Sequence, residues 1–256
     1  MTTARGRSAG DIDAHLRASG VTEWGAASND PPMALAPPLP RAISLMVAFQ
    51  QDALEGVGRG PTPAYFADYN RLNSTLNTAA TQLVEYLKDA GYRAMCVEAT
   101  LENYEEVEDW GDAGVFAHKT AATRAGLGWI GKTALLVSPV LGPKVRLATV
   151  FTDLDLPAGI PIDAGRCGRC RVCVDACPVG AGRDVTWEVG MTRDQLFDEK
   201  ACEGYLDRFP ELGWVCGICV AVCPFGRRAL SHPREGEPGV SRASRATGRR
   251  IDTDRV

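Results

Sequence analysis

Eight of the nine cysteines in this chain of 256 residues lie in one stretch, between residues 167 and 223. The stretch opens with C-G-R-C-R-V-C-V-D-A-C-P, in which two, two and three residues separate successive cysteines: Cys167, Cys170, Cys173 and Cys177. A second set begins with the lone Cys202 and continues in W-V-C-G-I-C-V-A-V-C-P, which contains Cys216, Cys219 and Cys223. Thiolates are metal ligands, so this density of cysteines points to metal chemistry.

The spacing within both runs is typical of cysteines that hold cubane [4Fe-4S] clusters in bacterial ferredoxins. Three cysteines on a tight loop can reach one cube, whereas the fourth, after a gap of three, ligates the other cluster in two-cluster ferredoxins. We therefore predict two clusters with crossed ligand sets. The first set is Cys167, Cys170, Cys173 and Cys223, and the second is Cys177, Cys202, Cys216 and Cys219.

Two other interpretations of these cysteines are weaker. Four-cysteine sets with C-x2-C halves also bind structural zinc, but zinc explains neither the two Cys-Pro endings nor the fourth cysteine after a gap of three. Disulfides would need an oxidising compartment, and the sequence has no sign of secretion.

Composition indicates an ordinary globular protein, with 45% hydrophobic and 23% charged residues. No apolar run approaches the ~20 residues of a membrane span, and the N-terminus has no hydrophobic segment to act as a signal. We therefore expect a cytoplasmic protein. The roughly 160 residues that precede the cysteine runs are enough for a separate core.

Hydrophobic periodicity and turn residues predict the elements of that region. In chain order these are a helix with a turn into a strand (10–28), a proline-rich connector (31–40), a buried strand (41–50), a helix (65–90), a strand (92–99), a helix (116–125), and a hairpin (133–138 with 145–153). Cys96, in the strand 92–99, is interpreted as a small buried hydrophobe.

The predicted fold class is α/β. An N-terminal α/β domain (1–160) precedes a ferredoxin-like double-cluster domain (161–228) and a polar tail (229–256). The last residues, 226–256, carry eight arginines against four acidic groups. Disorder is the default interpretation of such a tail, and arginines with no aromatic residue among them are weak support for a nucleic-acid site.

Two further segments attract attention. The sequence A-G-L-G-W-I-G-K (125–132) has three glycines in six residues, which would let the backbone approach something bulky. Between residues 97 and 112 there are seven acidic residues and no basic one. Such a run is usually a solvated loop.

The combination of A-G-L-G-W-I-G-K, V-F-T-D-L (150–154) and the double run with its lone Cys202 resembles the epoxyqueuosine reductase family. The segment Y-F-A-D-Y-N (65–70) is similar to a tyrosine-rich segment of that family. The resemblance implies that the N-terminal α/β domain is of cobalamin-binding type. It implies an oxidoreductase in which two [4Fe-4S] clusters pass electrons to a base-off cobalamin, held between the α/β and ferredoxin-like domains. Reductive dehalogenases share this layout.

The same resemblance assigns roles to residues of the glycine-rich segment. Contacts with the corrin are expected from Gly126, Gly128, Trp129, Gly131 and Lys132. For Trp129 the alternative is packing in the core. The resemblance also implies a low-potential donor such as ferredoxin or flavodoxin, and a substrate that is tRNA or a smaller molecule.

The position of the family's proton-donating aspartate falls on Asp112, but D-A-G-V replaces the Asp-Ser-Ala-Pro context common there. His118, followed by Lys119, stands where a glutamate is usual. Asp112 and His118 are therefore both candidate acids, because histidine has the more suitable pKa and Asp112 has the family's spacing.

The chain also ends about thirty polar residues after Cys223, whereas family members that act on tRNA usually continue into a helical region. Three hypotheses remain open: a corrinoid-dependent reductase that cleaves a C-O or C-halogen bond, an electron-transfer protein, and an activator that reduces the corrinoid of another enzyme.

Overall fold

A computed structural model describes residues 6–34, 36–99, 116–213 and 215–226 of the chain. Its main sheet has four strands in the order β1-β2-β6-β3, and every neighbouring pair is antiparallel. The strands are β1 (Glu23–Ser28), β2 (Arg41–Ala48), β6 (Val145–Thr152) and β3 (Ala94–Val97). Both faces of the sheet are covered, so the six central residues of β2 are all buried.

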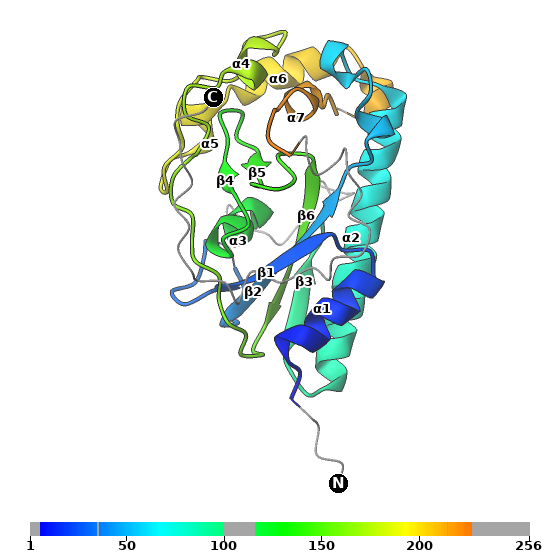
Figure 1. Ribbon diagram of the computed structural model, residues 1–256, viewed down its shortest axis with the longest axis vertical. Helices are drawn as coiled ribbons and strands as arrows, with labels where there is room; N and C mark the ends of the chain where they lie inside the picture. Colours follow the sequence, from blue (N-terminus) through cyan, green and yellow to red (C-terminus); the bar gives the residue numbers. More distant parts are fainter. Residues whose placement is uncertain (1–5, 35, 100–115, 214, 227–256) are drawn as a thin grey trace.

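The long helix α2 (Pro63–Asp89) covers one face of the sheet. It begins where the hydroxyl of Thr62 accepts a hydrogen bond from the Tyr65 backbone N–H, with Pro63 in the first turn, where its missing donor costs nothing. Leucines at helical spacing then pack against β2, β3 and β6. The shorter α1 (Ala9–Ala18) starts with a capping box and packs beside α2 (Figure 1).

The opposite face of the sheet is covered by α3 (His118–Arg124) and by a small hairpin of β4 (Trp129–Ile130) and β5 (Leu136–Val137). A second core lies here. It joins Trp129 and Ile130 to residues from the far part of the chain: Ile162, Trp187, Leu196 and Phe197. This core therefore crosses residue 160, the boundary predicted between the two domains.

The cysteine-rich segment forms short helices, namely α4 (Val172–Asp175), α5 (Arg193–Leu196), α6 (Glu199–Leu206) and α7 (Ile218–Ala221). Figure 1 shows α4, α6 and α7 together beyond one end of the sheet, beside β4 and β5. Two turns of 3-10 helix, Asp52–Leu54 and Val57–Arg59, follow β2, and the second of them contacts α7. A third turn, Pro210–Leu212, follows α6.

The predicted mixed α/β architecture is confirmed, and the elements predicted at 10–28, 41–50, 65–90, 92–99 and 116–125 are present within a few residues. The predicted hairpin of 133–138 with 145–153 is wrong. Val145–Thr152 lies in the middle of the main sheet, hydrogen-bonded to β2 on one side and β3 on the other. Leu136–Val137 instead pairs with Trp129–Ile130. The predicted polar tail (229–256) lies outside the described residues.

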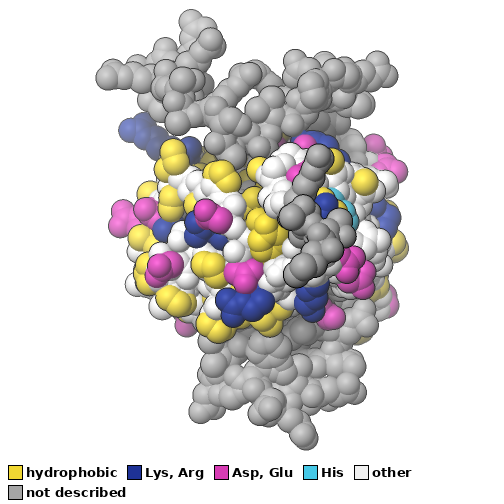
Figure 2. Space-filling view, turned by 90° about the horizontal axis from the view of Figure 1, so that it is seen from below, with side chains coloured by type: hydrophobic (Ala, Val, Ile, Leu, Met, Phe, Trp, Pro, Cys, Tyr) yellow, Lys and Arg dark blue, Asp and Glu magenta, His cyan; other side chains and the backbone are white. Residues whose placement is uncertain are grey.

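Surface charge is mixed rather than separated on the face turned away from the cysteine-rich segment. Figure 2 shows acidic and basic side chains next to one another among hydrophobic ones on that face. None of the helices in the described part of the chain is both long and apolar enough to cross a membrane.

Candidate iron-sulfur site

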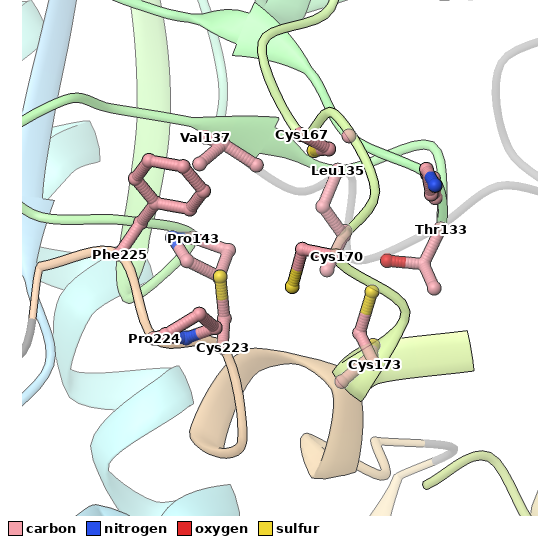
Figure 3. A pocket seen from close by; sticks show the side chains of 13 residues that line it. Thr133, Leu135, Val137, Pro143, Cys167, Cys170, Cys173, Cys223, Pro224 and Phe225 are labelled. Carbon is pink, nitrogen blue, oxygen red and sulfur yellow. The ribbon is translucent and has the colours of Figure 1, made fainter. Parts of the chain in front are cut away.

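Five cysteines line a single pocket at the junction of the cysteine-rich segment and the β4–β5 hairpin. The pocket residues are Gly131, Lys132, Thr133, Leu135, Val137, Pro143, Cys167, Cys170, Cys173, Cys219, Cys223, Pro224 and Phe225. In Figure 3 the sulfur atoms of Cys170, Cys173 and Cys223 point into the same space. The runs therefore converge although more than forty residues separate Cys173 from Cys219.

Tight turns bring the cysteines of each run together. The backbone N–H of Cys170 donates to the Cys167 carbonyl at 3.1 Å, around Gly168 in a left-handed conformation. In the second run, Gly217 has φ +81° and lies directly against the Tyr65 ring, where a β-carbon would come within 2.5 Å. Tyr65 thus fixes the start of α7 against α2, and glycine is required at that contact.

The thiols of the first predicted set influence one another. Burial raises the pKa of the Cys173 thiol, and Cys167 and Cys170 raise it further. Burial likewise raises the pKa of Cys223 to about 11, with contributions from Cys173 and Cys167. Thiolates crowded in this way repel one another, so the site favours a cationic metal centre that neutralises them.

The second predicted set has the same character. Burial raises the pKa of Cys202 to about 11, with Cys216 and Cys177 as the nearest contributing thiols. Burial raises that of Cys219 to about 12, helped by Cys216, Cys173 and Cys202. Cys219 also lines the pocket with the four cysteines of the first set. These neighbours agree with crossed ligand sets, whose assignment stays a prediction.

The glycines of the segment 125–132 face the chain itself. A β-carbon on Gly126, which has φ +74°, would lie 2.6 Å from the Ile160 carbonyl oxygen. One on Gly128 would lie 2.4 Å from the Val137 carbonyl oxygen, and one on Gly131 would lie 2.8 Å from the Val137 side chain. Packing within the chain therefore accounts for all three glycines. A corrin contact through the backbone of this segment stays a prediction.

The two side chains predicted as corrin contacts are buried. Trp129 is 2% exposed, packs edge-to-face on Phe225, and donates from Nε1 to the sulfur of Cys167 at 3.4 Å. Lys132 forms an ion pair with Asp184 at 2.7 Å. Core packing was the alternative interpretation of Trp129, and the structure places its ring in the second core, beside a predicted cluster ligand.

His118 is held by both of its ring nitrogens. Nε2 lies 2.8 Å from the Glu98 carbonyl oxygen. Because a carbonyl oxygen can only accept a hydrogen bond, Nε2 carries the proton. Nδ1 is then the acceptor, and the Thr149 hydroxyl donates to it at 2.9 Å. Burial lowers the pKa of His118 to about 4, and Arg146 contributes in the same direction. The imidazole is thus neutral at pH 7, with its single N–H already engaged.

The ammonium group of Lys119, the residue after His118, is also engaged in a hydrogen bond. Lys119 donates to the Ala134 carbonyl at 2.7 Å, and burial lowers the pKa of its ammonium to about 8. Asp112 lies outside the described residues, so its role stays a prediction.

Sequence reasoning missed three residues around the cysteines: Thr133, Lys144 and Phe225. Thr133 and Phe225 line the pocket, and Lys144 donates to the carbonyls of Cys223 and Phe225. The available signal was Lys144 itself, a lysine at the start of an otherwise apolar run. Its burial at 4% exposure follows from the position of β6 within the sheet, which the sequence pattern did not predict.

Comparison with protein families identifies the cysteine-rich segment. Residues 166–226 match a family described as "4Fe-4S double cluster binding domain". This part of the chain is thus a domain that binds two [4Fe-4S] clusters, as the cysteine spacing predicted.

Comparison of the whole sequence then confirms the resemblance to epoxyqueuosine reductases. The chain is 35% identical over 182 residues to the epoxyqueuosine reductase of Synechococcus sp. (strain CC9605), a match that covers 68% of this chain and 50% of that protein. It is also 39% identical over 116 residues to the tetrachloroethene reductive dehalogenase of Sulfurospirillum multivorans, covering 41% of this chain and 22% of that protein. The chain spans half or less of the length of these two relatives.

Solved structures share the fold. The catabolic reductive dehalogenase NpRdhA matches with a TM-score of 0.69 at 21% identity, over 87% of this chain and 32% of that chain. The epoxyqueuosine reductase from Streptococcus thermophilus matches with a TM-score of 0.53 at 18% identity, over 85% of this chain and 65% of that chain. Both comparisons support the arrangement of an α/β domain joined to a double-cluster domain.

Proposed function

We propose that this chain is an iron-sulfur reductase, in which two [4Fe-4S] clusters deliver electrons to a base-off corrinoid for reductive cleavage of a C-O or C-halogen bond. The observation that carries the proposal is the composition of the cysteine pocket. One wall comes from the cysteine runs, and the other from Gly131 to Val137 of the α/β part. A cluster bound there is in contact with the α/β part, so electrons can leave the cluster domain toward it.

The corrinoid enters this proposal through the relatives. A solved reductive dehalogenase of the same fold is described as supporting a mechanism for B12-dependent dehalogenation. Both ring nitrogens of His118 are already engaged in hydrogen bonds, so this histidine would not be among the residues that hold the corrinoid. When bound, the corrinoid would supply a cobalt centre of low potential, and we propose that backbone atoms of 126–132 contact it.

The chain's own residues have three tasks in such a reaction. They hold the clusters through eight cysteines, exclude water from the path between them, and provide a proton to the leaving group. His118 is poorly suited to the last task, since its N–H is committed to Glu98 and its pKa is far below 7. This leaves Asp112, at the family's spacing, as the proposed acid.

The substrate class is also a proposal. Epoxyqueuosine reductase relatives include one solved with an epoxyqueuosine-modified tRNA stem loop. The reductive dehalogenase relatives instead favour a smaller substrate. A low-potential protein such as ferredoxin or flavodoxin would supply the electrons.

The experiment is anaerobic reconstitution followed by metal analysis and cobalamin binding. We expect about eight irons and eight sulfides per chain, as two cubanes require. We also expect cob(II)alamin to bind in the base-off form, and turnover of an epoxyqueuosine stem loop or an organohalide with reduced flavodoxin. Two clusters with no corrinoid binding would instead support an electron-transfer protein. Corrinoid binding without turnover, joined to reduction of a partner's corrinoid, would support an activator.

A further inference from the structure

Three side chains from the α/β part reach the cysteines of the pocket. The first is Trp129, whose Nε1 donates to the sulfur of Cys167 at 3.4 Å. Its ring is 2% exposed and is braced by Phe225, which follows the Cys-Pro end of the second run. This hydrogen bond reaches a cluster ligand of the first set from a buried position.

The second is Lys144, which immediately precedes β6. Its side chain is 4% exposed, and Nζ donates to the carbonyls of Cys223 at 2.9 Å and Phe225 at 2.7 Å. An ammonium group is thereby fixed beside Cys223, the ligand that the second run contributes to the first set. A buried charge is screened far less by solvent and salt than an exposed one.

The third is Thr133, which is 7% exposed and lines the pocket together with Cys173 and Cys219. In Figure 3 its hydroxyl points toward the sulfur of Cys173. Cys173 belongs to the first predicted set and Cys219 to the second. A substitution at Thr133 should therefore change the reduction potentials of both clusters.

Reduction adds one negative charge to a cluster that already carries four thiolates. Hydrogen bonds to the sulfurs and nearby positive charge stabilise the reduced form and raise the reduction potential. Around the second set such effects are more balanced. Cys177 accepts from the Ala181 backbone N–H at 3.4 Å, whereas Cys202 lies near both Arg193 and Glu203, whose charges oppose each other.

We infer that Trp129 and Lys144 raise the reduction potential of the cluster held by the first set above that of its partner, while Thr133 raises both. This inference rests on the proposed function, because it assumes the crossed ligand sets. Electrons then collect on the first cluster, all four of whose predicted ligands line the pocket beside Gly131 to Val137 of the α/β part. These three are positioning residues that act through the clusters.

The test is an anaerobic redox titration of reconstituted protein followed by electron paramagnetic resonance. The variants are Trp129→Phe, which keeps an aromatic ring without its donor, Lys144→Met, which keeps the stem without its charge, and Thr133→Val, which keeps the shape without the hydroxyl. Controls are Lys144→Arg, which keeps the charge, and Lys88→Met, which removes an exposed charge near the far end of α2.

Trp129→Phe and Lys144→Met should lower the same one of the two midpoint potentials and leave the other unchanged. At a fixed solution potential the ratio of reduced to oxidised first cluster should fall about three- to tenfold in each. Thr133→Val should lower both midpoint potentials. The two controls, Lys144→Arg and Lys88→Met, should leave both midpoint potentials unchanged. Midpoint potentials are compared only between proteins that contain about eight irons per chain. If one variant loses a cluster, the other two variants still test the inference.

Unchanged midpoints in fully loaded Trp129→Phe and Lys144→Met would overturn the inference. Equal shifts of both midpoints in all three variants would overturn it as well, since a general loosening of the domain would act in that way. The potentials are measured without corrinoid or substrate. Failure to bind corrinoid would therefore count against the proposed function and leave this inference standing.

Discussion

The α-carbon of Gly128 lies so close to Val137 that a β-carbon on it would come within 2.4 Å of the Val137 carbonyl oxygen. The two residues belong to the turn before β4 and to β5, the strands of the small hairpin. That hairpin forms the α/β wall of the cysteine pocket. The glycine thus sets how closely the chain folds back on itself beside the clusters.

Gly128→Ala should therefore destabilise the protein and disturb the pocket. The Val137 backbone cannot rotate away from the added methyl group as a flexible side chain could. The free energy of unfolding should therefore fall by about 1–3 kcal/mol or more, as at other overpacked sites. The measurement is denaturant unfolding of the reconstituted protein, together with its iron content.

Gly204→Ala is the matched control for this change. Gly204 lies within α6, and a β-carbon there would meet nothing within 4 Å. Alanine is favoured over glycine inside a helix by about 1 kcal/mol, so this variant should be as stable as the wild type or more so. Equal stability of Gly128→Ala and Gly204→Ala would contradict the close approach.

The neutral His118 should make stability fall as the pH falls. Its pKa is about 4 in the folded chain against an ordinary value of 6.5, so between these values the unfolded chain binds a proton that the folded chain does not. The contribution is present above pH 6.5 and is lost as the pH falls toward 4. His118→Gln, which keeps a donor for Glu98, should lack this dependence.

Unfolding of the wild type and of His118→Gln can be compared between pH 7 and about 5. The wild type should lose more stability over this range than the variant, because other titrating groups are common to both and cancel. A constant difference across the range would mean that His118 titrates normally and is not held as the hydrogen bonds indicate.

The proposed proton donor can be tested with the same histidine as its control. Asp112→Asn removes the acid and should lower turnover by about 10²–10⁴-fold, with little change in corrinoid affinity or iron content. His118→Gln should lower turnover much less. The reverse order of these two losses would transfer the role to His118, and full activity in both would remove this part of the chain from the chemistry.

The parts of this structure that the sequence predicted depend on short-range patterns. The cysteine spacing defines loops of a few residues, and α2 shows its apolar face at helical intervals, so neither needs knowledge of distant partners. The pairing of β6 was mispredicted because its apolar run fits a hairpin edge and a central strand equally well. Only its contacts with both β2 and β3 distinguish the two.

The roles of residues within the site were harder to predict for a related reason. The glycines at 126, 128 and 131 indicate that another group lies close to the backbone, but they do not indicate which group it is. In the structure these neighbours are Ile160 and Val137 of the chain itself. Lys144 likewise gains its position from the sheet and its partners from residues about eighty positions later. Such long-range pairings are decided by the whole fold.

The crossed assignment of the cysteines gives the most direct test of the site. Replacing Cys177 by serine should remove the cluster that Cys202, Cys216 and Cys219 also hold, because it takes away one of four ligands. The other cluster keeps all its ligands, so about four irons per chain should remain. Cys167→Ser should remove the opposite cluster, and the two variants should show different midpoint potentials for the cluster that survives.

Cys96 supplies the control for these substitutions. It is the ninth cysteine, lies half-buried in β3 against the first core, and belongs to neither run, so Cys96→Ser should keep about eight irons. The readout is iron content joined to the paramagnetic resonance of the reduced protein. If Cys177→Ser and Cys167→Ser lost the same cluster, each run would hold its own cube, and the electron path would have to be redrawn. Thr133 would still line the pocket with Cys173 and Cys219 in that case, because this placement does not depend on how the fourth ligands are shared.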